Sequence, residues 1–359
     1  MKINVKNELI KRKFFRRLRE AEGLAEATVN CIEKAIALYE DFTKNADYAK
    51  LNPDKAVAFK KWLQKREFRG TFLSLSTQHG YLRYLVKFFT WLSGEPGYKS
   101  KIAIDTIAYL KLSRKDERVA TQYTPRNFPA VEYVRKLADS INVINEIDLR
   151  DRALIAFAIL SGARDKALAT LPLGCFNEET LVINQNPRAG VETKFAKHIP
   201  TTLFLFDEKL LSYVTAWVQH LRSREFGSQD PLFPRSKAEH GENSLSFLPA
   251  QEVTPEYWKT TGRIRQIFKR RAEEANLPYF PPHTFRHSAI ESALRSCKNG
   301  AEIKAVSQNF GHEHVATTFS SYGNYDPVTL SGIIKHIDFG KKGINTNINT
   351  NINNNKDTY

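Results

Sequence analysis

Apolar side chains recur at spacings of three and four residues along two separate stretches of the chain. In the first stretch this spacing predicts four helices, over residues 25–45, 54–66, 76–93 and 104–112. In the second it predicts helices over residues 130–141, 148–160, 207–224, 257–276, 284–297, 301–309, 315–321 and 327–337. Two short runs rich in strand-forming residues, 180–183 and 198–204, bracket a polar loop that contains Asn186, Pro187 and Gly190. That arrangement is typical of a β-hairpin.

The segment 116–130 separates the two stretches, because it carries two prolines and no apolar periodicity. We therefore expect an all-helical N-terminal domain at residues 1–118, a linker at 119–128 and an α+β domain at 129–340. The fold class is mainly α with a small β-sheet. Residues 341–359 are Asn-rich and of low complexity, and we expect them to be disordered.

The net charge of the chain indicates which class of binding partner to expect. The chain has 54 Lys and Arg against 39 Asp and Glu, a net charge of +15, which predicts a polyanionic partner such as nucleic acid or an anionic membrane surface. No run of about 18 apolar residues occurs, so a membrane-spanning helix is not expected. Residues 1–120 hold 25 of the basic residues and only 14 acidic ones. Six of the nine residues in KRKFFRRLR (11–19) are basic, as in a solvated helical face, a flexible arm or a phosphate-contacting segment.

The three cysteines, Cys31, Cys175 and Cys297, are far apart in the sequence and form no CxxC pair. This argues against a disulfide framework and against a thiolate zinc site, and it fits a reducing cytosol. The first residues contain no apolar signal-peptide core, so we expect a cytoplasmic protein. No P-loop and no clear trio of clustered carboxylates is found, and we expect neither a cofactor nor a metal.

Four segments carry residues suited to phosphate chemistry. They are SGARDKALATL (161–171), TKFAKHIP (193–200), PPHTFRHSAIESAL (281–294) and QNFGHEHVATTFSSYGNYD (308–326). In the third, Phe285, Ala289 and Ala293 recur at one-turn spacing as a buried stripe, with Arg286 on a neighbouring face. Each segment alone is weak evidence, since a lone arginine or histidine is more often structural than catalytic.

In this order the four segments resemble the tyrosine recombinases of the phage-integrase family, from about residue 20 to residue 340. The strongest matches are HTFRHS, FGHEHVATTFSSY and SGARDKALATL. The resemblance implies six catalytic residues: Arg164, Lys194, His283, Arg286, His312 and, as nucleophile, Tyr322. It also implies an N-terminal domain that binds the DNA core site and a C-terminal catalytic domain.

Two departures from the family pattern leave alternatives open. A glutamate that many members carry three residues after the first arginine is replaced by Ala167, with Asp165 nearby. The separation of His312 and Tyr322 is one residue longer than is common, so Tyr325 remains a rival nucleophile. Lys197 is likewise a rival to Lys194, because the sequence does not determine the register of the hairpin.

The resemblance implies a site-specific recombinase or integrase that cuts and rejoins DNA through a covalent 3′-phosphotyrosine, without metal or ATP. The partners implied are double-stranded DNA, three further copies of the chain in a tetramer, and accessory DNA-bending proteins. A type IB topoisomerase shares this chemistry and is the alternative enzyme. A DNA-binding protein that has lost catalysis is the alternative outside enzymes.

Overall fold

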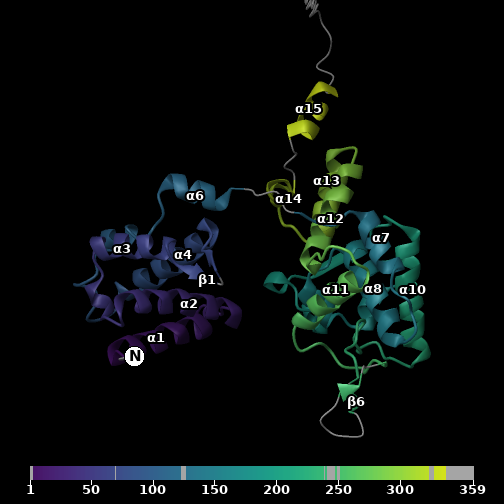
Figure 1. Ribbon diagram of the computed structural model, residues 1–359, viewed down its shortest axis with the longest axis horizontal. Helices are drawn as coiled ribbons and strands as arrows, with labels where there is room; N and C mark the ends of the chain where they lie inside the picture. Colours follow the sequence, from purple (N-terminus) through teal and green to yellow (C-terminus); the bar gives the residue numbers. More distant parts are fainter. Residues whose placement is uncertain are drawn as a thin grey trace, which may run out of the picture. The chain divides into compact units, whose positions relative to one another are not determined.

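A computed structural model of the chain describes residues 3–68, 70–122, 127–237, 239–240, 247–248, 251–322 and 327–336. The chain divides into two compact units, residues 1–125 and 126–359. Both are mainly helical (Figure 1). The expected fold class, mainly α with a small β-sheet, is confirmed. The Asn-rich tail predicted at 341–359 lies outside the described residues.

The first unit is a helical bundle with a two-residue hairpin. Its elements are α1 (Val5–Glu20), α2 (Glu26–Thr43), α3 (Pro53–Gln64), β1 (Glu67–Phe68), β2 (Thr71–Phe72), α4 (Leu75–Leu92), α5 (Ile104–Ala108) and α6 (Arg114–Thr121). Side chains of Asn52 and Ser74 accept hydrogen bonds from the first turns of α3 and α4, which fixes where these helices begin. The core is strongly aromatic, and Trp62 packs against it, stacked on Phe59 at 5.8 Å.

The basic run at 11–19 forms the second half of α1 and is not a flexible arm. Phe14 and Leu18 on this helix are fully buried in the aromatic core. Five of the six basic side chains of this run form ion pairs with glutamates of the same unit, such as Lys11 with Glu40. Much of the positive charge of α1 is therefore neutralised by ion pairs within the unit.

Helix α6 lies where the sequence predicts no periodic structure, and it overlaps the first residues of the predicted linker at 119–128. Ser113 caps it by accepting a hydrogen bond from the backbone N–H of Asp116. None of its residues is buried, which explains why apolar spacing does not reveal it. Residues 123–126 lie outside the described part of the chain.

The second unit holds the sheet and the remaining helices. Its elements are α7 (Val131–Asp139), α8 (Glu146–Ser161), α9 (Asp165–Thr170), β3 (Phe176–Asn177), β4 (Val182–Gln185), β5 (Ile199–Thr202), α10 (Glu208–Ser223), β6 (Glu239–His240), β7 (Phe247–Leu248), α11 (Gly262–Glu274), α12 (Pro282–Ser296), α13 (Gly300–Asn309), α14 (Val315–Tyr322) and α15 (Pro327–His336). The predicted helix at 257–276 begins later, at Gly262.

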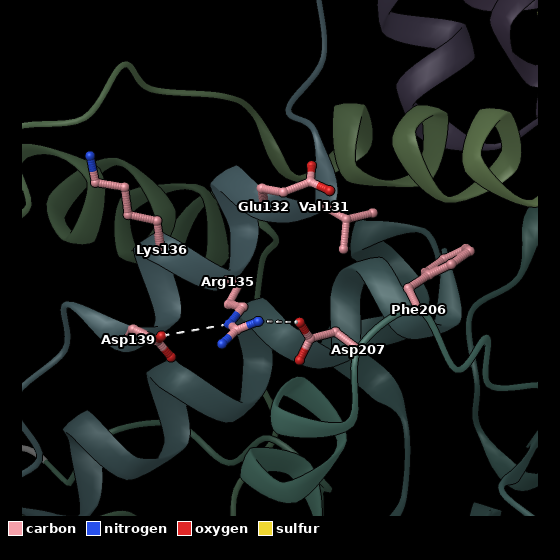
Figure 2. Close-up of a pocket in the computed structure, with 7 residues that line it drawn as sticks. All are labelled: Val131, Glu132, Arg135, Lys136, Asp139, Phe206 and Asp207. Carbon is pink, nitrogen blue, oxygen red and sulfur yellow. Dashed lines mark hydrogen bonds and ion pairs between the residues drawn. The ribbon is translucent and has the colours of Figure 1, made fainter.

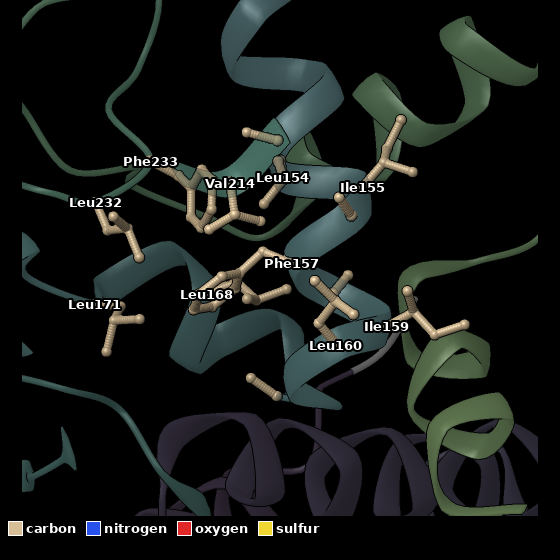
Figure 3. Packing of buried hydrophobic residues seen from close by; sticks show 14 of the residues in the cluster. Leu154, Ile155, Phe157, Ile159, Leu160, Leu168, Leu171, Val214, Leu232 and Phe233 are labelled. Carbon is tan, nitrogen blue, oxygen red and sulfur yellow. The ribbon is translucent and has the colours of Figure 1, made fainter. Parts of the chain in front are cut away.

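Helix α8 is the centre of this unit, since nearly every residue from Ala153 to Ser161 is buried. Its apolar side chains meet those of the segment 168–171, of α10 and of Phe233 (Figure 3). Phe157 packs edge-on against Phe233 at 5.2 Å between ring centroids. A helix that is apolar on all sides has to be enclosed by other elements. Its C-terminal end is therefore held rigidly, and the first candidate arginine follows it directly.

Strands β3, β4 and β5 form an antiparallel sheet in that order, with Ile183 opposite Thr201. The hairpin predicted from 180–183 and 198–204 is thereby confirmed. The last residue of α13, Asn309, docks on β5: its side chain accepts from the N–H of Thr202 at 2.7 Å and donates to the same residue's carbonyl at 2.9 Å. This contact holds the chain after α13 against the edge of the sheet.

Candidate active site

Arg286 connects three segments that are far apart in the sequence. It lies in the first turns of α12, on the face next to the buried Phe285 and Ala289, and its side chain is only 7% exposed. Its Nη1 donates to the carbonyl of Gly162 at 2.7 Å and its Nη2 to the carbonyl of Phe310 at 2.8 Å. The guanidinium carbon also lies 5.0 Å from the centre of the Phe310 ring. The orientation of Arg286 is thus determined by the end of α8 and the end of α13.

Glycine is required at both ends of this connection. Gly162 has φ +55°, and a Cβ there would lie 2.3 Å from the Phe310 ring. Gly311 has φ +70°, and a Cβ there would lie 2.6 Å from Ile199 of β5. Neither position tolerates a side chain, both for the backbone conformation and for the space. These two glycines allow the chain to pass close enough for Phe310 and His312 to reach Arg286.

His312 lies beside Arg286 in a strongly positive environment. Its Nε2 is 3.3 Å from Nη2 of Arg286, and its Nδ1 is 2.8 Å from Oγ1 of Thr318. Burial and, after it, the positive charges of Arg286, Arg164, Lys194 and Lys197 together lower the pKa of His312 to about 4. The ring is therefore neutral at pH 7 while no anion is bound.

Arg164 is the first residue before α9 and is half-buried. It lies two residues after Gly162, which ends α8 and whose carbonyl accepts from Arg286. The neighbouring Asp165 forms an ion pair with Arg265 of α11 at 2.7 Å. Ala167 stands where many members of the family that the sequence resembles carry a glutamate. Its side chain packs into the core. Asp165 is thus paired with α11.

Lys194 and Lys197 lie on the loop between β4 and β5, around a 3₁₀ turn at Lys194–Ala196. The exposed Phe195 between them has φ +62°, a backbone conformation that is unfavourable for a residue with a side chain. Both ammonium groups lie near the face of its ring, Lys194 at 5.0 Å from the centroid. Lys197 also pairs with Glu313 at 2.5 Å. The positive charge of Lys197 is therefore partly neutralised by Glu313, the residue after His312.

The structure brings Arg164, Lys194, Arg286 and His312 into one electrostatic cluster, which we call the cationic site. His283 lies one turn before Arg286 on α12 and is exposed, with its ring 6.2 Å from that of His287. Tyr322 is the last residue of α14, four positions after Thr318. Tyr325 lies outside the described residues, so this rivalry stays a prediction.

Sequence reasoning missed the buried polar residues that support the cationic site. Thr318 is fully buried and its hydroxyl donates to Oγ of the equally buried Ser307 at 2.8 Å. Asn309, which joins α13 to β5, was also not singled out. The available signal was a pair of threonines, Thr317 and Thr318, on the predicted helix between the histidine and the tyrosine. A polar residue at a helical position that faces the core usually has a hydrogen-bond partner.

Two further observations concern other kinds of site. Figure 2 shows a pocket beside α7, where Arg135 lies between Asp139 and Asp207; its lining shares no residue with the cationic site. Within the described ranges, no three His, Cys, Asp or Glu side chains are grouped so that they could hold a metal ion. No helix in the same part of the chain is long and apolar enough to cross a bilayer.

Comparison with known proteins places this geometry among DNA-processing enzymes. A family model described as the phage integrase family matches residues 130–327. Tyrosine recombinase XerD of Vibrio vulnificus (strain YJ016) is 22% identical over 277 residues, which cover 72% of this chain and 78% of the relative. Two solved structures share the fold. XerH recombinase in a post-cleavage complex with palindromic difH substrate is 17% identical, with a TM-score of 0.59 and coverage of 90% of this chain and 83% of that one. The lambda integrase dimer bound to a COC′ core site is 12% identical, with a TM-score of 0.58 and coverage of 89% and 79%.

Proposed function

This chain belongs to the phage integrase family as a tyrosine-type site-specific DNA recombinase, and we propose that it cuts and rejoins DNA strands through a covalent 3′-phosphotyrosine, without metal or ATP. The observation that carries the proposal is the cationic site. Arg286 lies 3.3 Å from His312, and burial together with the charges of Arg286, Arg164 and Lys194 lowers the pKa of this histidine. Such a concentration of positive charge is suited to an anion, and DNA offers a phosphodiester.

The two arginines have the chemistry that phosphoryl transfer requires. Negative charge builds up on the non-bridging oxygens of the phosphate in the transition state, and guanidinium groups donate paired hydrogen bonds to such oxygens. Arg286 is pre-oriented by the carbonyls of Gly162 and Phe310. Arg164 follows the same turn. We propose that these two clamp the phosphate and that His312 donates a third hydrogen bond to it.

The remaining steps are assigned by the family pattern. Tyr322 attacks phosphorus, its proton passes to His283, and the bond between phosphorus and the 5′-oxygen breaks. Lys194 protonates the departing 5′-oxygen. The energy of the broken bond is kept in the new phosphotyrosine, so a 5′-hydroxyl of another strand can reverse the reaction. The pairing of Lys197 with Glu313 supports Lys194, and not Lys197, as this acid.

We further propose that the unit formed by residues 1–125 binds the DNA core site and that four copies assemble on DNA in the cytoplasm, bound to the nucleoid. Strand exchange between two duplexes needs four cleavages, which four copies of one active site supply. Accessory DNA-bending proteins and an origin in a mobile element belong to the same proposal. XerH and lambda integrase were both solved on DNA.

The proposal is tested with a nicked suicide substrate that traps the covalent intermediate. We expect wild-type protein and Tyr325→Phe to form a protein–DNA adduct, and Tyr322→Phe to bind the same DNA without forming one. Phenylalanine removes a single oxygen and keeps the ring, so a loss of adduct reports on chemistry and not on folding. If Tyr322→Phe forms an adduct and Tyr325→Phe does not, the nucleophile is Tyr325. Adducts in both variants would refute the mechanism.

A further inference from the structure

A chain of three hydrogen bonds, one buried and two partly buried, runs through the cationic site. Thr318 of α14 and Ser307 of α13 are 0% and 1% exposed. Oγ1 of Thr318 donates to Oγ of Ser307 at 2.8 Å, and the same Oγ1 lies 2.8 Å from Nδ1 of His312. On the other side of the ring, Nε2 of His312 lies 3.3 Å from Nη2 of Arg286.

The hydrogen atoms in this chain follow from the direction of the bond between the two hydroxyls and from the chemistry of the guanidinium group. A threonine hydroxyl has one hydrogen, and in Thr318 it is directed at Ser307. Its oxygen must therefore accept from the ring, which places the hydrogen of the neutral imidazole on Nδ1 of His312. A guanidinium group has donors and no acceptor, so Nε2 of His312 accepts from Arg286. Both ends of the chain impose the same tautomer.

We propose that Thr318, supported by Ser307, is a positioning residue that holds His312 as the Nδ1–H tautomer, so that His312 gains a donor at Nε2 only by taking up a proton when a phosphate enters the site. The catalytic part of this inference rests on the proposed function. The tautomer itself does not, because it follows from the contacts of the DNA-free chain.

The groups that face His312 explain why proton uptake accompanies phosphate binding. Arg286 approaches from α12, Arg164 from the start of α9, and Lys194 and Lys197 from the β4–β5 loop, where Glu313 already pairs with Lys197. These cations disfavour a charged ring. A phosphate placed among them reverses that field, and the ring then binds a proton at Nε2 from solvent. The phosphate thereby generates its own third hydrogen-bond donor.

The direct test uses the full-length, DNA-free protein labelled with ¹⁵N-histidine. The nitrogen chemical shifts of a histidine ring distinguish its two tautomers and its charged form. We expect His312, identified among the nine histidines by the loss of its signals in His312→Gln, to be neutral and Nδ1–H at pH 7. Ser307→Ala frees the Thr318 hydroxyl to donate to Nδ1, and should shift the population towards Nε2–H. Thr318→Ser should keep the wild-type pattern.

A matched control is Thr215→Val on α10, whose hydroxyl bonds to Leu211 of its own helix; the His312 signals should not change. An Nε2–H or charged ring in the wild-type protein overturns the inference. So does an unchanged tautomer in Ser307→Ala. Because Ser307→Ala and Thr318→Ser are small changes, the test does not depend on a variant that fails to fold.

Cleavage provides the second readout. Thr318→Val keeps the side-chain volume and removes the hydroxyl. It should slow cleavage by about 10–100-fold, by analogy with the loss of a hydrogen-bond partner that orients a metal-ligating histidine. Ser307→Ala, which supplies an Nε2–H without proton uptake, should keep its cleavage rate to higher pH than the wild type does. A structural role alone would lower the rates without moving the pH profile. If the wild-type protein forms no adduct at all, the proposed function fails while the tautomer result stands.

Discussion

At the scale of single residues, Gly162 combines two roles that no other amino acid can fill. Its φ of +55° and the 2.3 Å approach of the Phe310 ring exclude a Cβ, and its carbonyl accepts from Arg286. We expect Gly162→Ala to lower the free energy of unfolding by at least about 2 kcal/mol, from overpacking together with left-handed strain, and to abolish cleavage. Urea denaturation measures the first effect.

The matched control for this change is Gly190→Ala. Gly190 also has a positive φ, +87°, but a Cβ there would meet nothing within 4 Å. It should therefore show the backbone strain without the steric clash, and it should still cleave DNA. Equal losses of stability in the two variants would mean that the contact with Phe310 is unimportant.

His312 makes stability depend on pH in a defined window. Its pKa is about 4 in the folded chain and near 6.5 when unfolded, so between these values the unfolded state binds more protons. The contribution of the neutral ring is present in full above about pH 6.5 and is lost as pH falls towards 4. We expect His312→Gln to show a shallower loss of stability than wild type across this window in urea titrations. An identical slope would show that the ring is not held neutral.

At the residue level the sequence pattern pointed to the charged residues of the cationic site and not to the groups that support them. Arg164, Arg286 and His312 are recognisable because a family pattern assigns their order and spacing. Ser307 and the carbonyl of Phe310 carry no such signal, since a serine or a backbone group becomes part of a site only through tertiary packing. That Arg286 is buried was also not predictable, because its partners lie 124 and 24 residues away.

At the scale of elements, α15 is the helix whose exposed apolar side chains need an explanation. Leu330 and Ile334, one turn apart, are 48% and 49% exposed. We expect this face to dock on a neighbouring copy of the chain in the assembled tetramer. Ending the chain at Tyr325 should weaken assembly on DNA, measured by sedimentation, and slow strand exchange. Ending it at Gly343 removes only the Asn-rich tail and should do neither; unchanged assembly in the shorter chain would contradict the docking.

Elements with a clear apolar stripe were predicted well, and elements without one were not. The stripe of α12 through Phe285 and Ala289 gave the correct helix and the correct buried face. In contrast, α6 has no buried residue and is determined by its cap at Ser113, which is a local signal too weak to outweigh the nearby prolines. The two-residue strands β6 and β7 contain only one period of strand alternation, which is too little for a sequence pattern to reveal.

At the scale of the whole molecule, the two units differ in charge. Residues 1–120 contain 25 Lys and Arg against 14 Asp and Glu. Most of the basic side chains of α1 form ion pairs with glutamates of the same unit. The exposed pairs among them, such as Arg19 with Glu26, contribute little to stability. We expect residues 1–122, which have their own core, to bind duplex DNA at low salt with an affinity that falls steeply as salt rises. Absence of binding in a gel-shift assay at low salt would refute this.

The way in which Arg286 is held has a consequence for the synthesis of the protein. The guanidinium is oriented by carbonyls at residues 162 and 310, and the second of these is translated late. A nascent or prematurely terminated chain that stops before residue 310 contains Arg164 and Lys194, but its Arg286 is not oriented and His312 is missing. If the proposed function is correct, we expect a chain that ends before residue 310 to cleave no DNA, so the capacity to cut DNA would arise only when translation is nearly complete.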